Sequence, residues 1–320
     1  MRAFDYTTPS TVGDALKLAK PGSAFLAGGT TLVDLMKLDV MTPERVIDVN
    51  SLPLKGIRLH QGALRIGALE RMSDVAAHPI VHPMISRALL LSASGQIRNM
   101  ASIGGNLMQR TRCDYFRDAT SPCNKRRPGS GCPALTGVNR NHAILGTSDH
   151  CAATHASDVA VAFVALDAEV VLRSKDGDRT LPLEDFYRLP GSTPDRENAL
   201  NPGELIAEII VPALPWRSTY LKIRDRQSYE FALTSVAAAI NLKRGVIQDV
   251  RLAAGGVGTK PWRLRAVEEA LKGSVAMERT FADAAEHAVD GARPLAHNKF
   301  KTSLLKRTIV RALLDVAGVR

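Results

Sequence analysis

The segment AFLAGGTTLVDLMKL, residues 24–38, places a strand, a glycine pair, a hydroxyl pair and a helix in immediate succession. Ala24 to Ala27 predicts a short buried strand, and Leu32 to Leu38 has the apolar spacing of a helix. Between them, Gly28-Gly29-Thr30-Thr31 can hold phosphate, because glycine lets the backbone approach an anion and the hydroxyls add donors. Such a turn is more often merely a turn, so alone it indicates a phosphate site only weakly.

A second glycine-containing segment, GQIRNMASIGGN at residues 95–106, repeats this chemistry with a hydroxyl, two glycines, an amide and a basic residue. Two such loops on one chain suggest a long phosphate-bearing cofactor that bridges them. Neither loop matches G-x-G-x-x-G, and residues 256–261, GVGTKP, lack its last glycine. The chain also lacks G-x-x-x-x-G-K-S/T, so neither a Rossmann site nor a P-loop is indicated.

The remaining pattern alternates strands and helices. Thr11 or Ser10 can cap a helix at 12–20, Ser73-Asp74 can cap another, and Ser157-Asp158 a third that runs to Leu166. Pro212 and Pro215 mark a domain boundary. Further strands are predicted at 45–49, 64–69, 169–173, 205–211, 219–223, 234–242 and 246–254, and further helices at 80–92, 264–271, 277–289 and 299–317.

All four cysteines, Cys113, Cys123, Cys132 and Cys151, fall in one segment of the 320-residue chain. Thiols used only as small core residues would scatter, so this clustering favours a bound metal centre. No pair is a C-x-x-C, which disfavours a zinc ribbon, a zinc finger or a thioredoxin-type pair and leaves an iron–sulfur cluster open. Two disulfides, which need an oxidising compartment, or four unrelated thiols are the alternatives.

Composition narrows the function classes. No apolar stretch approaches 18 residues, so no membrane span is predicted, and the N-terminus lacks a run of signal-peptide length, which favours the cytoplasm. The formal charge of +10 fits an anionic cofactor or an acidic partner better than nucleic acid, because aromatics are only 5% and no binding motif is present. Part of the excess positive charge lies near the cysteines. There it would either favour the reduced form of an anionic cluster or form a docking surface. The basic residues are Arg98, Arg110, Arg112, Arg117, Lys125, Arg126, Arg127 and Arg140.

Four motifs together resemble the FAD-binding subunit of the molybdenum hydroxylases, the xanthine dehydrogenase and aldehyde oxidoreductase group, nearly end to end. They are AGGT at 27–30, SIGGN at 102–106, SD at 157–158, and GGV at 255–257 followed by Pro261 and Arg263. The run from Gln109 to Cys132 resembles the bacterial aldehyde oxidoreductase branch, whose flavin subunit carries an extra [4Fe-4S] cluster.

The resemblance implies an α+β chain. Residues 1–213 would form a two-subdomain FAD-binding fold of the vanillyl-alcohol-oxidase or PCMH type, with an inserted iron–sulfur loop at 107–151. Residues 214–320 would form a smaller α+β C-terminal domain of the CO dehydrogenase flavoprotein type. The cluster ligands would be the four cysteines. FAD contacts would come from Leu26, Ala27, Gly28, Gly29, Thr30, Thr31, Leu32, Val33, Asp34, Ser102, Gly105, Asn106, Asp158, Ile206 and Lys222.

Three of these FAD contacts, and the dipeptide before the Ser-Asp pair, carry separate arguments. Ser102 stands where the family usually has threonine and keeps the hydroxyl. His155-Ala156 stands where a proline commonly precedes the Ser-Asp pair. Lys222, as a cation near the flavin, would favour a reduced, anionic ring; set apart from the resemblance, it is simply a lysine at a strand end. Asp158, judged on its own, is a helix-capping residue.

The resemblance also implies a heterotrimer. A large subunit with a molybdenum cofactor would oxidise an aldehyde, and electrons would pass through [2Fe-2S] clusters of a small subunit to FAD on this chain and on to an external acceptor. No residue of this chain is then needed as a general acid or base. Export with a partner that bears a twin-arginine signal would place the complex in the periplasm instead.

Three other functions remain open. The flavin subunit of 4-hydroxybenzoyl-CoA reductase also carries an inserted cysteine loop. A stand-alone flavin oxidoreductase would turn over its own substrate without partners. A zinc-stabilised basic module that binds nucleic acid would be colourless, and its binding would fall steeply with salt.

Overall fold

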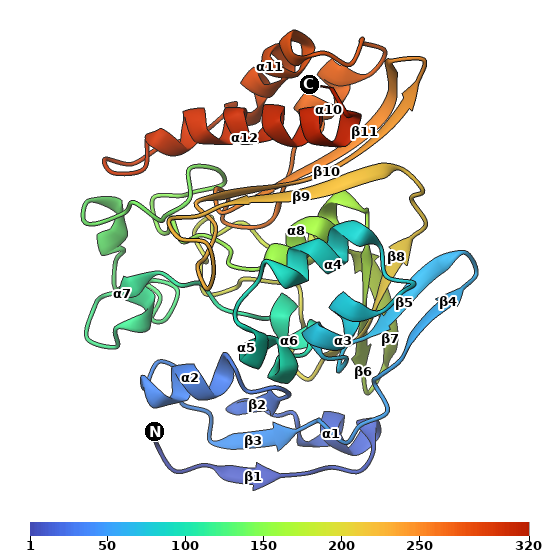
Figure 1. The fold of residues 1–320 in the computed structure, drawn as a ribbon. Coiled ribbons are helices and arrows are strands. Elements are labelled where there is room, and N and C mark those ends of the chain that lie inside the picture. The colour runs from blue at the N-terminus through green and yellow to red at the C-terminus, as the bar shows by residue number, and fades with distance from the viewer. Residues whose placement is uncertain (320) are drawn as a thin grey trace.

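The computed structural model describes residues 1–319 and contains three β-sheets (Figure 1). The first is small and parallel, with the order β1-β3-β2. Its strands are β1 (Asp5–Thr7), β2 (Ser23–Leu26) and β3 (Arg45–Asp48), connected by α1 (Val12–Leu18) and α2 (Leu32–Lys37). Thr11 caps α1 as predicted, because its side chain accepts a hydrogen bond from the backbone N–H of Asp14.

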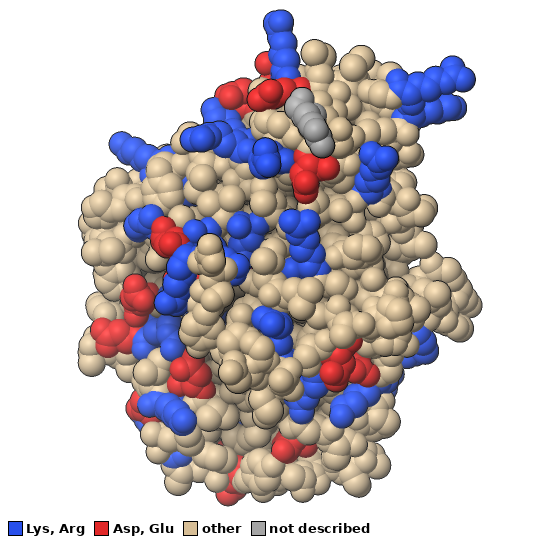
Figure 2. Space-filling model, in the orientation of Figure 1, with Lys and Arg blue, Asp and Glu red and all other residues tan. Residues whose placement is uncertain are grey.

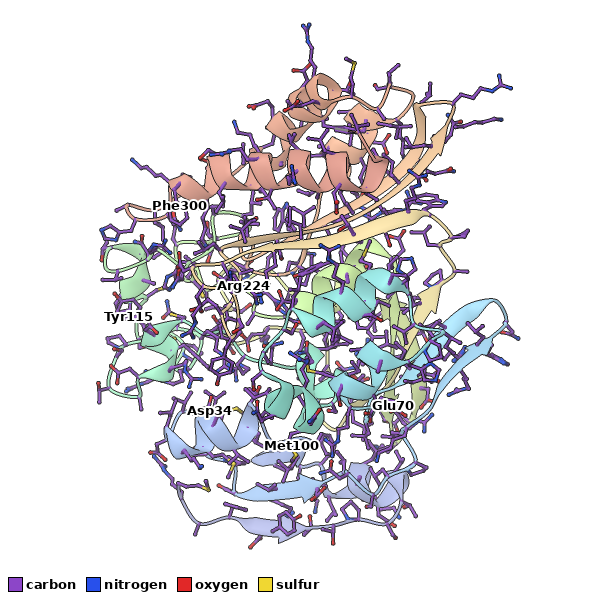
Figure 3. The ribbon with its side chains drawn as sticks, in the orientation of Figure 1. Asp34, Glu70, Met100, Tyr115, Arg224 and Phe300 are labelled. Atoms are coloured by element: carbon purple, nitrogen blue, oxygen red, sulfur yellow. The ribbon has the colours of Figure 1, made fainter. Side chains whose placement is uncertain are left out.

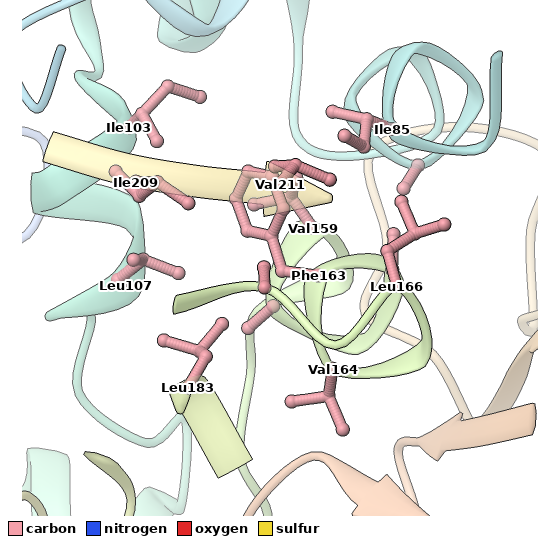
Figure 4. Packing of buried hydrophobic residues seen from close by; sticks show 14 of the residues in the cluster. Ile85, Ile103, Leu107, Val159, Phe163, Val164, Leu166, Leu183, Ile209 and Val211 are labelled. Atoms are coloured by element: carbon pink, nitrogen blue, oxygen red, sulfur yellow. The ribbon is translucent and has the colours of Figure 1, made fainter. Parts of the chain in front are cut away.

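The second sheet is antiparallel, with the order β4-β5-β8-β6-β7. Helix α8 is buried along its whole length, because its apolar residues surround the axis rather than forming one stripe. Phe163 of α8 packs near Leu183, Ile209 and Val211 (Figure 4), and burial of each such side chain contributes about 1.5–3 kcal/mol. The elements of this layer are β4 (Ile57–His60), β5 (Ala63–Gly67), β6 (Glu169–Ser174), β7 (Gly177–Pro182), β8 (Leu205–Pro212), α3 (Met72–Ala77), α4 (Pro83–Leu90), α5 (Gly95–Met100), α6 (Ile103–Leu107), α8 (Asp158–Ala165) and α9 (Leu183–Phe186).

The third sheet is antiparallel, with the order β12-β11-β10-β9, and lies between α12 on one side and α4 and α8 on the other (Figure 1). The predicted apolar stripe of α12 is confirmed, since Leu305, Ile309, Leu313 and Val316 are all buried against this layer. The elements are β9 (Arg217–Ile223), β10 (Thr234–Lys243), β11 (Val246–Gly255), β12 (Trp262–Arg263), α10 (Arg265–Leu271), α11 (Glu278–Ala285), the 3-10 turn η2 (Glu286–Val289) and α12 (Phe300–Ala317).

The cysteines lie in a mostly irregular segment between α6 and α8, which we call the cysteine segment (residues 108–157). It contains only the short helix α7 (Asp114–Arg117) and the 3-10 turn η1 (Pro133–Leu135). In Figure 1 it forms the green part at the side of the molecule, between the N-terminal layer and the start of α12. The segment contacts both α2, through Asp34, and the start of α12, through Lys301.

Two local expectations were wrong. Ser73 and Asp74 do not cap α3, because the helix already begins at Met72 with Arg71 as its cap residue. The second glycine loop is not an open turn but two short helices, α5 and α6, capped by the side chains of Ser94 and Ser102. Among the described residues, no helix has the length and apolar character needed to cross a membrane.

Candidate functional site

The two glycine loops meet in space. A side chain at Gly28 would overlap the carbonyl group of Met100, and its Cβ would lie 2.8 Å from the Cα of Ala101. Gly29 has a φ of +73°, in the left-handed region that other residues rarely adopt. The turn after β2 therefore packs directly against the end of α5, and only glycine allows that approach.

A cavity of about 970 Å³ opens at this meeting point. Leu26, Val33 and Asp34 do not line it, whereas the other predicted FAD contacts do. Those lining residues are Ala27, Gly28, Gly29, Thr30, Thr31, Leu32, Ser102, Gly105, Asn106, Asp158, Ile206 and Lys222. Most of the predicted residues thus share one site, although they come from five separate stretches of the chain.

A buried polar cluster forms part of the cavity wall around Asp158. Its carboxylate pairs with Lys222 at 2.8 Å, accepts from the Tyr220 hydroxyl at 2.7 Å and from Ser92 at 3.1 Å. Burial, followed by the charge of Asp158, raises the pKa of Tyr220 well above its ordinary value, so this hydroxyl stays protonated and donates. Asp158 is therefore more than a helix cap, since the capping bond to α8 comes from Ser157.

The same pairing changes the role expected of Lys222. Its side chain is only 1% exposed, and its ammonium also donates to the backbone carbonyl of Leu91 at 3.1 Å. Because the charge is balanced by Asp158, Lys222 does not present an uncompensated cation to the cavity. The pair instead joins β9 to the first turn of α8, and the bond from Lys222 to Leu91 joins β9 to the end of α4.

Sequence reasoning missed several stretches that line the cavity, among them parts of residues 188–205 and of residues 226–231. The proline and glycine content of the first gave no indication of a binding role. Arg110 and Lys125 both pair with Glu197, which holds this stretch against the cysteine segment. In the second stretch, Arg112 lies over the ring of Phe231 at 5.0 Å.

The four cysteines, far apart in sequence, line one small cavity with Tyr115 and Phe116. The enclosed space is about 10 Å³, so a group larger than a single atom would spread the surrounding loops. No set of three or more His, Cys, Asp or Glu side chains within residues 1–319 is placed to hold a single metal ion. Thiolates around one zinc ion would have to converge to about 4 Å of one another.

Asn124 ties three of the cysteine positions together. Its side-chain amide donates to the carbonyl of His150 at 3.0 Å, and its Oδ1 accepts from the N–H of Gly131 at 2.8 Å. These are the neighbours of Cys151 and Cys132, and Asn124 itself follows Cys123. One buried amide thus sets the spacing of three turns.

Two of the thiols, Cys113 and Cys151, have raised pKa values, and Cys151 interacts with Cys132. Burial raises the pKa of Cys113 to about 12. The thiol of Cys151 donates to Cys132, which lowers the pKa of Cys132 to about 7 and raises that of Cys151. Binding of a metal centre would therefore release protons from this cavity.

The basic residues near the cysteines are largely paired. Arg117 and Arg112 contact Asp34 of α2 at 2.8 and 3.2 Å, and Arg140 contacts Asp225 at 2.9 Å. Arg126 donates to backbone carbonyls between Tyr115 and Ser121 and so braces that loop. Figure 3 shows Asp34 in the N-terminal layer below the segment that carries Tyr115.

The distribution of charge over the surface bears on the nucleic-acid alternative. Acidic and basic side chains are interspersed on the face drawn in Figure 2, with no continuous basic stripe. A nucleic-acid backbone requires such a stripe, so this face does not favour that function.

His142 and His155 were not predicted to be functional. The Nε2 atom of His142 lies 3.2 Å from the Sγ of Cys113. His155 is partly buried with its ring 4.5 Å from that of Tyr187, and desolvation lowers its pKa to about 3, so it is neutral. No local motif marks either residue, because the contacts join segments distant in sequence.

The cavity and its two glycine turns define a protein that binds a nucleotide-like cofactor. Residues 2–214 match the family described as the FAD binding domain in molybdopterin dehydrogenase, and residues 219–316 match the CO dehydrogenase flavoprotein C-terminal domain. The chain therefore belongs to the FAD-binding medium subunits of the molybdenum hydroxylase family, and it is an oxidoreductase subunit.

Two curated relatives match over nearly their whole lengths. The aldehyde oxidoreductase FAD-binding subunit of Escherichia coli K12 is 48% identical, over 98% of this chain and 98% of the relative. The glyceraldehyde dehydrogenase medium chain of Sulfolobus acidocaldarius is 29% identical, over 97% and 95%.

A solved carbon monoxide dehydrogenase from Hydrogenophaga pseudoflava is 26% identical, with a TM-score of 0.77 over 99% of this chain and 98% of that chain. The predicted fold class, an α+β FAD-binding region followed by a C-terminal domain of the CO dehydrogenase flavoprotein type, is confirmed.

Proposed function

We propose that this chain is the FAD- and [4Fe-4S]-binding electron-transfer subunit of a molybdenum-dependent aldehyde oxidoreductase. In this assignment, it works in a heterotrimer with a large molybdenum-cofactor subunit and a small [2Fe-2S] subunit. The assignment of FAD to this chain rests on the cavity between Gly28 and Ser102. The aldehyde part is supported by the 48% identity to an aldehyde oxidoreductase FAD-binding subunit.

The residues fit FAD in three respects. The cavity of about 970 Å³ lies at the upper end of the range for cofactor sites, which is about 300–1,000 Å³. Gly28 and Gly29 leave room for backbone amides to approach a pyrophosphate, and Thr30, Thr31 and Ser102 supply hydroxyls. When bound, FAD would supply one- and two-electron transfer. The chain's own part is to bind and orient it, with the Asp158–Lys222 pair fixing the wall.

The four cysteines supply the ligand set of a cluster, and the loops around their cavity of about 10 Å³ would have to move apart to admit it. Four thiols line one space, which is the ligand set of a [4Fe-4S] centre. A cube places its ligands at separate corners, so convergence on one atom is not needed. Asn124 and Arg126 would hold the loops around it.

The first experiment is to purify the chain anaerobically and measure FAD, iron and acid-labile sulfide, with absorption spectra before and after dithionite. We expect flavin bands on a broad iron–sulfur shoulder, both of which bleach. Flavin without iron, even after iron–sulfide reconstitution, would remove the cluster and keep the flavoprotein. A colourless, zinc-containing protein would contradict both.

Single substitutions locate the cluster. Cys132→Ser or Cys151→Ser should lose iron and keep FAD, whereas Thr136→Ser, an exposed hydroxyl residue on the same segment, should keep both. Loss of FAD in the cysteine variants as well would mean that they act through misfolding.

Turnover separates the alternatives. The isolated chain should show no turnover with aldehydes, and the co-purified heterotrimer should reduce a dye with them. Turnover by the chain alone would favour a stand-alone oxidoreductase, and activity with an aromatic acyl-CoA would favour 4-hydroxybenzoyl-CoA reductase. Cell fractionation would distinguish the cytoplasm from the periplasm, which the complex could reach with a partner that bears a twin-arginine signal.

A further inference from the structure

His142 makes a contact that the proposed function does not yet use. Its Nε2 atom lies 3.2 Å from the Sγ of Cys113, and the residue is 5% exposed. Its Nδ1 atom is buried and has no hydrogen-bond partner. The imidazole thus has a single polar neighbour in hydrogen-bond range, the sulfur of a proposed cluster ligand.

The C-terminal part of the chain fixes the backbone of His142. The ammonium of Lys301, in the first turn of α12, donates to the His142 carbonyl at 3.1 Å and to that of Gly256 at 2.7 Å. The amide of Asn298 donates to the same His142 carbonyl at 3.2 Å. Lys301 and Asn298 are both 0% exposed. Figure 3 shows Phe300, at the start of α12, next to the segment that carries Tyr115.

The chemistry of the contact determines which nitrogen carries the proton. A cysteine bound to iron is a thiolate, which has no proton to donate and accepts hydrogen bonds. The Nδ1–H tautomer would leave a buried N–H without an acceptor and would point a lone pair at the thiolate, which are both unfavourable. The Nε2–H tautomer leaves only a bare nitrogen unpaired and donates to sulfur.

We propose that His142 is a positioning residue that donates its Nε2–H to the thiolate of Cys113 and raises the reduction potential of the cluster. The proposal rests on the iron–sulfur part of the proposed function. An N–H···S bond stabilises negative charge on the sulfur, and the reduced cluster carries one more electron than the oxidised one. The bond therefore favours the reduced state. Lys301 and Asn298 hold the donor in place from a different domain.

The test is an anaerobic redox titration of the purified protein, followed by the electron paramagnetic resonance signal of the reduced cluster. His142→Leu removes the donor and should shift the midpoint potential to a more negative value. His142→Gln keeps an N–H at a similar reach and should recover most of the shift. His297→Leu is the control, because His297 is an exposed histidine that does not line the cysteine cavity.

A second measurement detects the contact in the wild-type protein, so its main result does not depend on the stability of a variant. Protein grown with ¹⁵N-histidine should show weak nitrogen coupling in the spin-echo spectrum of the reduced cluster, and His142→Gln should lose it. An unchanged potential in a fully loaded His142→Leu protein, or no histidine coupling in the wild type, would overturn the proposal. A wild-type chain without iron would instead overturn the cluster assignment, which metal analysis reveals before any titration.

Discussion

At the scale of single residues, Gly28 is a position that cannot accept a side chain. Any side chain there would meet the carbonyl of Met100, and that atom belongs to the backbone, which cannot rotate away as a side chain does. Gly28→Ala should therefore displace the turn after β2 and weaken FAD binding at least about tenfold, which corresponds to about 1.4 kcal/mol. Released-flavin fluorescence after equilibrium dialysis measures this.

The matched control is Gly95→Ala in α5. A Cβ at Gly95 would meet no atom within 4 Å, and alanine suits a helix better than glycine. This variant should bind FAD as the wild type does. Equal binding by both variants would show that the turn after β2 does not contact the cofactor.

The Asp158–Lys222 pair makes a second residue-scale prediction. Both side chains are nearly inaccessible, at 7% and 1% exposed. Lys222→Met should lower the free energy of unfolding by about 3–5 kcal/mol, because it leaves a buried carboxylate without its partner. Denaturant unfolding measures the loss, and adding Asp158→Asn to Lys222→Met should recover part of it.

An exposed pair provides the comparison. Lys175 and Asp176 are each 77% exposed, so Lys175→Met should not change stability measurably. If Lys222→Met were equally silent, the pair would not hold β9 against α8, and Lys222 would be free to act as the cation that the resemblance implies.

At the scale of elements, α2 and the cysteine segment are joined by charge. The hydrogen bond from Arg117, ahead of the other causes, lowers the pKa of Asp34 below its ordinary value of 3.8. A carboxyl whose pKa is lower in the folded state stabilises the fold above its ordinary pKa, and this contribution disappears as the pH falls. The difference in unfolding free energy between wild type and Asp34→Asn should thus be full near pH 6 and shrink below about pH 4.

Denaturant titrations at matched cofactor content measure this difference. Asp176→Asn, at a fully accessible position, should show no such pH dependence. A difference for Asp34→Asn that stayed constant down to pH 3 would mean that the ion pairs with Arg117 and Arg112 do not form in solution.

The elements also show how far the sequence could predict the structure. Strands β10 and β11 and helix α12 were predicted within about two residues, because long apolar runs or stripes identify them. Helices α5 and α6 were missed, since glycine and polar residues dominate them and their serine caps hold them in place. No role was predicted for the stretch before β8, because only the distant contacts of Glu197 bring it to the cavity.

The residues of the candidate site were likewise only partly predictable from the sequence. Local motifs identified the glycine turns and the Ser-Asp pair, and the resemblance placed Ile206 and Lys222 with them. The pairing of Lys222 with Asp158 and the contact of His142 with Cys113 depend on three-dimensional packing. No local pattern records such contacts.

At the scale of the whole molecule, the cavity links cofactor binding to stability. A ligand that binds only the folded chain at 100 times its dissociation constant stabilises it by about 2.7 kcal/mol. FAD should therefore raise the unfolding temperature of the flavin-free chain in a thermal scan, and Gly28→Ala should respond much less at the same concentration. The absence of any shift in the wild type would contradict the FAD assignment of the cavity.

The cavity wall has one more consequence, for synthesis of the chain. Its lining runs from Ser23 to Phe231, so the last part of the wall leaves the ribosome only after most of the polypeptide has been made. A nascent chain ending before β9 lacks Lys222 and the 226–231 stretch, and has no closed site to retain a nucleotide. Loading would therefore follow translation of the chain through Phe231, at the start of the C-terminal domain. Shortened products would stay colourless and could be told apart from mature subunits by eye.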